Sequence, residues 1–385
     1  MSVEIITKGL SRLMRLFSLC VLMIAASCSQ NHRNYKTDIL FMGDLAFGES
    51  YQQVLGNRGK PNILKTKGYL YSFEQIKPIM GNSNFIVANL ETPICPYDSS
   101  QKISDKKKYL HFADTAIAPK ILSKLSIDAV SLANNHSLDF GEFGLGQTLD
   151  LLKKQKIKCF GAGNDLSKAA EPLVIPLVKD DFVKNIYIMG CYEYNRSYDE
   201  SYSFYANQNK PGVFLLSDVT LKMIQTIKSN DKDAFVILFP HWGENYKWKN
   251  NSQSKWARKL IDSGADLIIG HGAHRMQEFE KYKGKWILYS LGNSVFNSPG
   301  RFAKNKSLPY SLLTALSFSE ESYTIQCYPV LSDNKITNYQ PCLIKHEDMI
   351  LLYQALMDYR VKEEGIEIQQ NEFGSYFELK ATLNP

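Results

Sequence analysis

Six short polar clusters, each at the end of an apolar run, constrain the fold of this chain more than any other feature. The first three are GDLAF at 43–47, NLE at 89–91 and NNH at 134–136. The other three are HWG at 241–243, GHGAH at 270–274 and SLGN at 290–293. Active-site residues of α/β sheets collect at strand ends because the loops there converge on one edge. The pattern therefore predicts an α/β protein whose clusters meet along one rim.

The apolar runs predict a mixed α/β pattern in which several strands are covered on both faces. We expect strands at 39–42, 85–88, 129–132, 186–189, 234–239, 267–269 and 286–291, and helices at 116–125, 144–156, 217–228, 252–263 and 348–360. A hairpin turning at 281–285 and an antiparallel pair of 312–318 with 324–330 follow from the turn residues and the alternation. The long segments 93–108 and 194–211 are predicted loops, and the second, rich in Tyr, Asn and Ser, is predicted to form a binding lip.

The residue types in the clusters are those that hold metal ions. Four of the seven histidines lie in them, together with an Asp, a Glu and an Asn. Oxygen and nitrogen donors without thiolate suit manganese, iron or zinc, so we expect one or two divalent ions. Two ions about 4 Å apart would hold a phosphoryl group and lower the pKa of a water molecule towards 7. His136 would then orient the substrate or protonate the leaving oxygen.

Two neighbouring features favour this interpretation. His271 and His274 flank two small residues in a Gly-rich loop, which lets backbone and ligand approach closely. Trp242 beside His241 would shield an imidazole–metal bond from water. The remaining histidines lack such settings and are predicted to be surface or packing residues: His32, His111 and His346.

Each residue also fits a role without metal. Asp44 alone is typical of a turn, and Glu91 is equally compatible with a helix cap or a surface turn. His136 fits a core hydrogen bond, His241 a semi-buried histidine and Asn134 a capping side chain. The clusters carry the metal prediction only as a set.

The amino terminus has the pattern of a secretory signal. Three basic residues and one acid lie in 1–15, an apolar run of 12 residues follows at 16–27, and Cys28 comes next. A bilayer span needs about 20 residues, although a shortened anchor or a buried helix is the alternative. Ala25, Ala26 and Ser27 before Cys28 resemble the bacterial lipobox, which implies that 1–27 is removed and that Cys28 is lipidated. Residues 28–36 would be a tether to the membrane.

Charge and cysteine content exclude several classes of protein. The net charge of +6 falls to +4 without the signal, and no arginine–aromatic interleaving indicates nucleic-acid binding. The basic run 106–108 is predicted to be a solvated face. Five cysteines remain beyond Cys28 and none has CxxC spacing, so neither a zinc knuckle nor a full disulfide framework is indicated. One bridge would be best placed between Cys327 and Cys342.

The successive motifs resemble those of the CapA family of poly-γ-glutamate capsule-biosynthesis proteins, whose fold is like that of the calcineurin-type metallophosphoesterases. The matching segments are TDILFMGD, VANLETPI, SLANNHSLDFG, the HWG run, DLIIGHGAHRMQ and YSLGNSVF. The resemblance covers 37–345 and implies a four-layer α/β-β/α sandwich with two mixed sheets. A C-terminal helix and tail, 346–385, would pack on the same domain.

The resemblance also implies site residues and a function. His136 would be the catalytic imidazole, and the metal ligands would be Asp44, Glu91, Asn135, His241, His271 and His274. Asn134, Trp242 and Asn293 would contact substrate. The implied protein is exported, lipid-anchored at the bacterial cell envelope, and acts in synthesis or export of an extracellular polymer. It would be a metal-dependent hydrolase of phosphoester-type bonds or a non-catalytic component that binds an anionic polymer, with capsule-synthesis membrane proteins as partners.

Four positions depart from the family pattern. Ala46 stands where metallophosphoesterases have the His of Asp-x-His, and Gly272 stands at the first His of G-x-H-P-H. Asn245 occupies the usual Glu position after HWG, with Glu244 moved before it, and Ser294 replaces an aromatic residue. These departures leave a mononuclear site open as an alternative to a dinuclear one.

Overall fold

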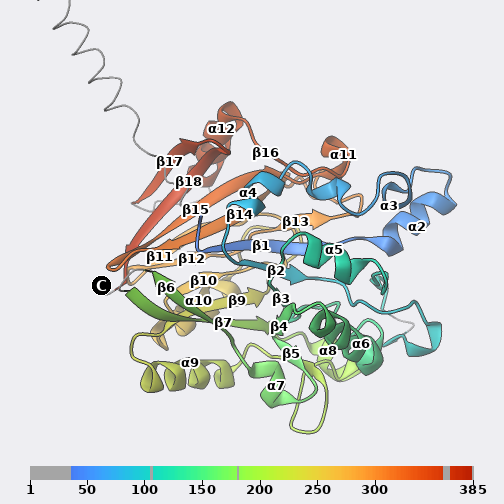
Figure 1. The fold of residues 1–385 in the computed structure, drawn as a ribbon, viewed down its shortest axis with the longest axis horizontal. Coiled ribbons are helices and arrows are strands. Elements are labelled where there is room, and N and C mark those ends of the chain that lie inside the picture. The colour runs from blue at the N-terminus through green and yellow to red at the C-terminus, as the bar shows by residue number, and fades with distance from the viewer. Residues whose placement is uncertain (1–35, 105–106, 180–181, 359–364, 384–385) are drawn as a thin grey trace, which may run out of the picture. The chain divides into compact units, whose positions relative to one another are not determined.

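Two mixed β-sheets form the centre of the compact unit Thr37–Pro385 in the computed structural model (Figure 1). The structure describes residues 36–104, 107–179, 182–358 and 365–383. The predicted signal, Cys28, His32 and nearly all of the tether lie outside these residues. No helix in the described part of the chain is long and apolar enough to cross a bilayer.

Within the described residues the larger sheet has ten strands and the smaller has six. The path of the larger sheet is β17 (Ile366–Asn371), β18 (Gly374–Thr382), β15 (Ser322–Leu331), β14 (Tyr310–Phe318), β1 (Ile39–Ala46), β2 (Ile86–Leu90), β3 (Ala129–Ser131) and β4 (Lys158–Phe160), with β13 (Asn293–Phe296) beside β1 and β16 (Cys342–Leu343) beside β15. The smaller sheet runs β11 (Phe279–Tyr282), β12 (Lys285–Leu288), β10 (Leu267–Ile269), β9 (Phe235–His241), β7 (Phe182–Tyr192) and β6 (Leu173–Lys179). A separate pair joins β5 (Ala162–Gly163) to β8 (Gly212–Val213).

Helices connect and cover these strands. They are α2 (Glu49–Asn57), α3 (Ile63–Thr66), α4 (Lys77–Gly81), α5 (Ala118–Lys124), α6 (Gly141–Lys154), α7 (Leu166–Ala170), α8 (Arg196–Tyr202), α9 (Asp218–Asn230), α10 (Asn251–Asp262), α11 (Asn334–Thr337) and α12 (His346–Asp358), with 3₁₀ turns at Tyr71–Phe73 and Ser99–Gln101. The five longer helices expected from the sequence are present with ends shifted by a few residues.

The layer order follows from the alternation of side chains along the strands. In β1, Ile39 and Phe41 enter the core between the sheets, whereas Leu40 and Met42 face the outer layer that includes α5 and α6. In β9, Phe239 points into the same inner core, and neighbouring outward residues pack with α9 and α10. Both sheets mix parallel and antiparallel pairs. The predicted four-layer α/β-β/α sandwich with two mixed sheets is therefore confirmed.

Helix α10 shows how local sequence positions a loop of the rim. Asn250 Oδ1 accepts from the Gln253 N–H at 2.9 Å, and Gln253 Oε1 accepts from the Asn250 N–H at 3.0 Å, forming a capping box. The Gln253 side chain also lies against Gly243, where an added Cβ would come within 2.7 Å of its amide nitrogen. The start of α10 thus holds the chain that leaves β9.

Two features of the C-terminal half differ from the expectation. The tail after α12 forms β17 and β18, which join the larger sheet through β15 and were not predicted. The disulfide proposed between Cys327 and Cys342 is wrong, because the five described cysteines are free. Cys342 lies opposite Leu331, four residues along β15 from Cys327, and this offset of about 13 Å is too long for a disulfide.

Candidate metal centre

The sheet topology brings the polar clusters to one place. Strands β1, β2 and β3 are parallel neighbours, so Asp44 near the end of β1, Glu91 after β2 and the NNH cluster after β3 share one edge. In the other sheet, β9 ends at His241 and the parallel strand β10 leads into His271, which forms a bridge with His241. The predicted convergence of these clusters is observed.

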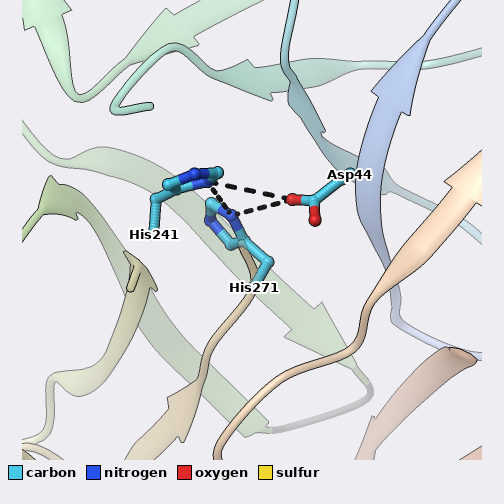
Figure 2. A group of neighbouring side chains, drawn as sticks. All are labelled: Asp44, His241 and His271. Atoms are coloured by element: carbon cyan, nitrogen blue, oxygen red, sulfur yellow. Dashed lines mark hydrogen bonds and ion pairs between the residues drawn. The ribbon is translucent and has the colours of Figure 1, made fainter. Parts of the chain in front are cut away.

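Asp44, His241 and His271 form the first candidate ligand set (Figure 2). Asp44 Oδ1 lies 3.3 Å from His271 Nδ1 and 3.8 Å from His241 Nδ1. The two imidazole Nδ1 atoms lie 3.0 Å apart. All three side chains are buried. Metal–ligand bonds near 2.1 Å place the ligand atoms of a tetrahedral ion about 3.4 Å apart, which is close to these separations.

The hydrogen bonds around this set leave lone pairs pointing inward. His271 Nε2 lies 3.3 Å from the Phe239 carbonyl, which can only accept, so Nε2 carries the proton and Nδ1 is free to ligate. The Asn89 amide donates to Asp44 Oδ1 at 2.9 Å and lies 3.4 Å from His241 Nδ1, which accepts. Two imidazole lone pairs and a carboxylate oxygen thus face one another, and a cation satisfies all three.

Asp44, Glu91 and His274 form the second candidate set. His274 Nδ1 donates to Asn293 Oδ1 at 2.8 Å, which leaves Nε2 to face Glu91 Oε1 at 3.8 Å. Asp44 Oδ2 lies 3.5 Å from Nδ1 of the same imidazole. His274 itself has φ +57°, an unusual backbone conformation for a residue with a side chain. Asp44 belongs to both sets, with one oxygen directed to each, as in a carboxylate that bridges two ions.

The electrostatics of the two carboxylates fit bound cations. Burial alone would raise the pKa of Asp44, but the neighbouring imidazoles of His271, His241 and His274 hold it at about 2. Burial, and then the charge of Asp44, raise the pKa of Glu91 well above its ordinary value. Both Glu91 oxygens are buried and lack a hydrogen-bond partner among the described residues. An unpaired buried carboxylate is unfavourable, so the residues present fit divalent ions.

Three of the departures from the family pattern have a structural explanation. Each ligand set contains three residues, although Ala46 supplies no ligand atom. The Ser294 hydroxyl accepts the Gly43 N–H at 2.7 Å and fixes the turn before Asp44. The Gly272 N–H donates to Asp44 Oδ2 at 3.1 Å from a backbone with φ +102°. Asn245, the fourth, lines the neighbouring cavity.

We expect Gly272→Ala to weaken the centre. A Cβ at this position would lie 3.0 Å from the His241 ring, and the positive φ disfavours any side chain. The strain should lower the free energy of unfolding by about 1–3 kcal/mol and displace a ligand, as measured by denaturant unfolding and metal content. Gly59→Ala is the matched control, because Gly59 has φ +68° and nothing within 4 Å of its Cβ. Equal effects of the two substitutions on metal content would contradict this role of Gly272.

His136 lies beside the second ligand set and is oriented by a carboxylate. Its Nδ1 lies 2.7 Å from Asp139 Oδ2, and its Nε2 lies 3.8 Å from Glu91 Oε1. Asp139 also forms an ion pair with Lys107 and accepts the His111 N–H at 2.6 Å. Nδ1 therefore donates to Asp139, and Nε2 is directed towards the centre. Burial, and then the positive charge of Lys107, lower the pKa of His136 well below its ordinary value.

Four of these residues were missed or misjudged from the sequence. Lys107 is buried against Asp139, so the predicted solvated face is wrong at this position. His111 is not merely a packing residue, because its ring stacks on His136 with centroids 3.6 Å apart and planes 4° apart. Asn89 contacts both Asp44 and His241. Of the four, Asn89 lies in the NLE cluster and Asp139 lies three residues after His136, so both had a usable sequence signal.

The residues predicted to contact substrate have other roles. Asn134 donates to Asn89 Oδ1 at 3.0 Å and to the Leu90 carbonyl at 2.9 Å. Trp242 is buried in the outer core, where its indole N–H donates to the Tyr289 carbonyl at 2.7 Å. Asn293 accepts from His274. Trp242 faces the outer core, which corrects its predicted contact with substrate, whereas substrate contact by Asn134 and Asn293 stays a prediction. Asn135, predicted as a ligand, lines a cavity with a buried Oδ1 that has no partner among the described residues.

A cavity of about 720 Å³ adjoins the centre through His136 and His274. Among the described residues, its other lining side chains include the cations Arg58, Lys107, Lys108 and Arg301, the aromatics Tyr51, Tyr109, Tyr198, Tyr202, Tyr246 and Phe296, and no Asp or Glu. Tyr198 and Tyr202 belong to α8, within the segment predicted to form a binding lip. The cavity is therefore suited to an anionic group.

The part of the chain that contains the motifs matches a known protein family. Residues 38–298 match the family described as bacterial capsule synthesis protein PGA_cap. The chain belongs to this family. It is 30% identical over 270 residues to the PGA biosynthesis protein CapA of Bacillus subtilis strain 168, covering 69% of this chain and 65% of that protein. It is 28% identical over 311 residues to the capsule biosynthesis protein CapA of Bacillus anthracis, covering 75% and 69%. This PGA_cap chain thus spans about two thirds of the length of these relatives.

Solved structures with a similar chain path have low sequence identity. The calcineurin-like phosphoesterase YfkN from Bacillus subtilis is 12% identical, with a TM-score of 0.34 and coverage of 83% of this chain and 97% of that one. The protein TT1561 of Thermus thermophilus is also 12% identical, with a TM-score of 0.38 and coverage of 72% and 94%. At this level the similarity concerns the fold and carries no inference about activity.

Proposed function

We propose that this PGA_cap protein is a metal-dependent hydrolase of phosphoester-type bonds that acts in synthesis or export of an extracellular polymer of the poly-γ-glutamate type. The polymer is suggested by the names of the CapA relatives. The chemistry rests on one observation: Asp44 is shared by two buried three-residue ligand sets. A histidine with a carboxylate partner lies beside the second set.

The chain would hold two divalent ions with the ligands already described. His241, His271 and one Asp44 oxygen would bind the first, and Glu91, His274 and the other Asp44 oxygen would bind the second. When bound, such ions polarise a phosphoryl oxygen and lower the pKa of a nucleophilic water. Asn89, the Phe239 carbonyl and Asn293 keep the ligating atoms directed inward.

His136 is placed to transfer a proton. Its Nδ1–H is fixed by Asp139, so the ring orientation is set and Nε2 is the atom that exchanges a proton with the leaving group. Burial raises the pKa of Asp139, and the Lys107 ammonium opposes this rise and holds the carboxylate in position. His111 packs flat against the ring and prevents its rotation.

The cavity supports an anionic substrate and also a second candidate function. Lys108 and Arg301 both lie over the Tyr109 ring, at 5.4 Å and 4.8 Å from its centroid, and neither forms an ion pair with a described residue. Arg58 adds a further cation. Cationic side chains in a cavity that has no Asp or Glu in its described lining favour binding of a polyanion, with or without turnover. A non-catalytic polymer-binding component of the export machinery is therefore the alternative.

A hydrolysis assay tests the proposal. The protein is supplied with manganese or zinc, and the substrate is a generic phosphodiester, bis(p-nitrophenyl) phosphate. We expect His136→Ala to lower kcat by about 10²–10⁴-fold with little change in metal content. His346→Ala is the matched control, because that imidazole is exposed, contacts Ser375 and belongs to neither ligand set. Absence of turnover, or equal turnover of wild type and His136→Ala, would leave the binding function as the better account.

We also propose that the protein is exported and anchored to the envelope through lipid on Cys28. The support is the signal-like sequence at 1–27, and several acyl chains would give stable attachment where one is marginal. We expect Cys28→Ser to move the protein from the membrane fraction to the soluble fraction, with loss of the lipid mass. Cys159→Ser is the control for loss of a thiol. Unchanged fractionation of Cys28→Ser would contradict the anchor.

A further inference from the structure

A second cavity, of about 620 Å³, has no role in the metal centre. It lies against α2, which contributes Glu49 and Gln53 to it. Tyr51 of the same helix and Arg58 just after it line the cavity next to the metal centre. The two cavities have no lining residue in common. The second cavity is therefore a separate candidate site.

Glu49 is the unusual group in this cavity. Its Oε1 accepts from the Tyr69 hydroxyl at 3.1 Å and from the Asp114 N–H at 3.0 Å. Its Oε2 is buried and has no hydrogen-bond partner among the described residues, and the residue is only 6% exposed. A purely structural role, joining α2 to the segment before α5, explains Oε1 and leaves Oε2 unexplained. A buried carboxylate oxygen of this kind needs a hydrogen-bond donor, which a ligand can supply.

The surroundings define the chemistry of that ligand. The Asp114 carboxylate, whose Oδ1 accepts from two backbone N–H groups, adds negative charge next to Glu49. Aromatic rings of Tyr69, Tyr97 and Phe112 line the same space. Carboxylates combined with aromatic faces are the features that recognise organic ammonium groups.

We propose that this cavity binds a ligand carrying a primary ammonium group, with one N–H donated to the free Glu49 oxygen and the attached carbon chain against the aromatic wall. A primary ammonium offers three donors and a positive charge, and both are missing around the Glu49 Oε2 atom. Lys65 also lines the cavity, but its backbone N–H is used to cap α3 and its side chain forms no ion pair with a described carboxylate. The acidic pair is therefore available to an external cation.

The titration of Glu49 is consistent with this geometry. Burial raises its pKa to about 7, against the opposing effect of hydrogen bonds from the Asp114 N–H, its own backbone N–H and the Tyr69 hydroxyl. The groups that face it are Asp114 on the segment before α5, Tyr69 on the segment after α3, and Lys65 of α3. An ammonium ion requires the ionised carboxylate, so binding should weaken as the pH falls below 7.

Calorimetric titration of the full-length protein with n-butylammonium chloride tests the site, with uncharged 1-butanol as the shape control. We expect the ammonium to bind and the alcohol to bind roughly tenfold more weakly or not at all. Glu49→Gln keeps the shape of the side chain and should lower the ammonium affinity about tenfold or more. Glu142→Gln, at an exposed glutamate of α6, is the matched control. Circular dichroism establishes that each variant is folded.

A second arm uses only the wild-type protein. With a pKa of about 7 for Glu49, the ammonium affinity should fall about tenfold between pH 8 and pH 6. Equal binding of n-butylammonium and 1-butanol, an affinity unchanged by pH, or undiminished binding to folded Glu49→Gln would each overturn the proposal. None of these outcomes bears on the metal centre, whose ligands lie outside this cavity.

Discussion

Asp44→Asn is expected to remove both metal ions from this PGA_cap protein at once. Asp44 is the residue common to the two ligand sets, with Oδ1 directed to His241 and His271 and Oδ2 to His274. Replacing the carboxylate by a neutral amide removes the negative charge that both sets share and puts an N–H donor in place of one of the two ligating oxygens. The loss of affinity should exceed the roughly 10–100-fold that follows removal of an outer-shell partner.

Metal analysis after desalting, with manganese or zinc supplied beforehand, measures this effect. Wild type should retain two equivalents, Asp44→Asn close to none, and Glu91→Gln one, because Glu91 belongs to the second set alone. Asp262→Asn is the control, at a partly exposed carboxylate paired with Lys283. If Asp44→Asn kept the same single ion as Glu91→Gln, Asp44 would not be shared by the two sets. One equivalent in wild type would show that the centre is mononuclear.

The convergence of the polar clusters could be predicted because it follows from topology. Parallel strands place their carboxyl ends at one edge, so Asp44, Glu91 and His136, which follow neighbouring strands, had to meet. The same reasoning reaches His241 and His271 in the second sheet. No assumption about side-chain packing is needed for this step.

The residues that support the ligands could not be predicted in this way. Lys107 and His111 come from a long irregular segment without periodicity, and the sequence gives no measure of how such a segment folds back over His136. Trp242 was misassigned for a simpler reason. Successive residues of a strand point to opposite faces, so His241 facing the centre requires Trp242 to face the outer core.

The C-terminal strands were missed because their place in the larger sheet depends on a contact with β15, which is distant in the sequence. β17 (IEIQQN) alternates apolar and polar residues but lies at the sheet edge with half its side chains exposed. β17 pairs with β18 in a hairpin. Only the pairing of β18 with β15 joins this hairpin to the larger sheet. Edge strands of this kind depend on tertiary contacts more than on local propensity.

Glu91→Gln is expected to have opposite effects on the stability of the metal-free and metal-loaded protein. Without metal, burial and the charge of Asp44 raise the pKa of Glu91 well above its value in the unfolded chain. Such a carboxyl stabilises the fold below the unfolded pKa and loses this contribution as the pH rises towards the folded pKa. The free energy of unfolding should therefore fall by up to about 1.4 kcal/mol per pH unit in this range.

The histidines set the range in which this slope is visible. Burial lowers the pKa values of His111, His136 and His241 well below their ordinary value. Unfolding below about pH 6.5 therefore takes up protons, and stability falls as the pH drops through that region. Above about pH 7 these imidazoles are neutral in both states. Burial also raises the pKa values of Glu49, Glu193 and the buried cysteines, so the contribution of Glu91 is the difference between the slopes of wild type and Glu91→Gln.

Urea unfolding between about pH 7 and pH 9, with chelator or with excess manganese, separates the two states. In chelator, Glu91→Gln should be more stable than wild type, with the difference growing as the pH rises. In manganese the order should reverse, since the amide cannot replace the anionic ligand of the second ion. Glu244→Gln, at an exposed glutamate, controls for the change in net charge.

The reversal is decisive. A residue that only packs in the core would shift both curves in the same direction. A metal ligand instead destabilises the fold without its ion and stabilises it with the ion bound. Parallel shifts in chelator and in manganese would show that Glu91 does not hold a cation.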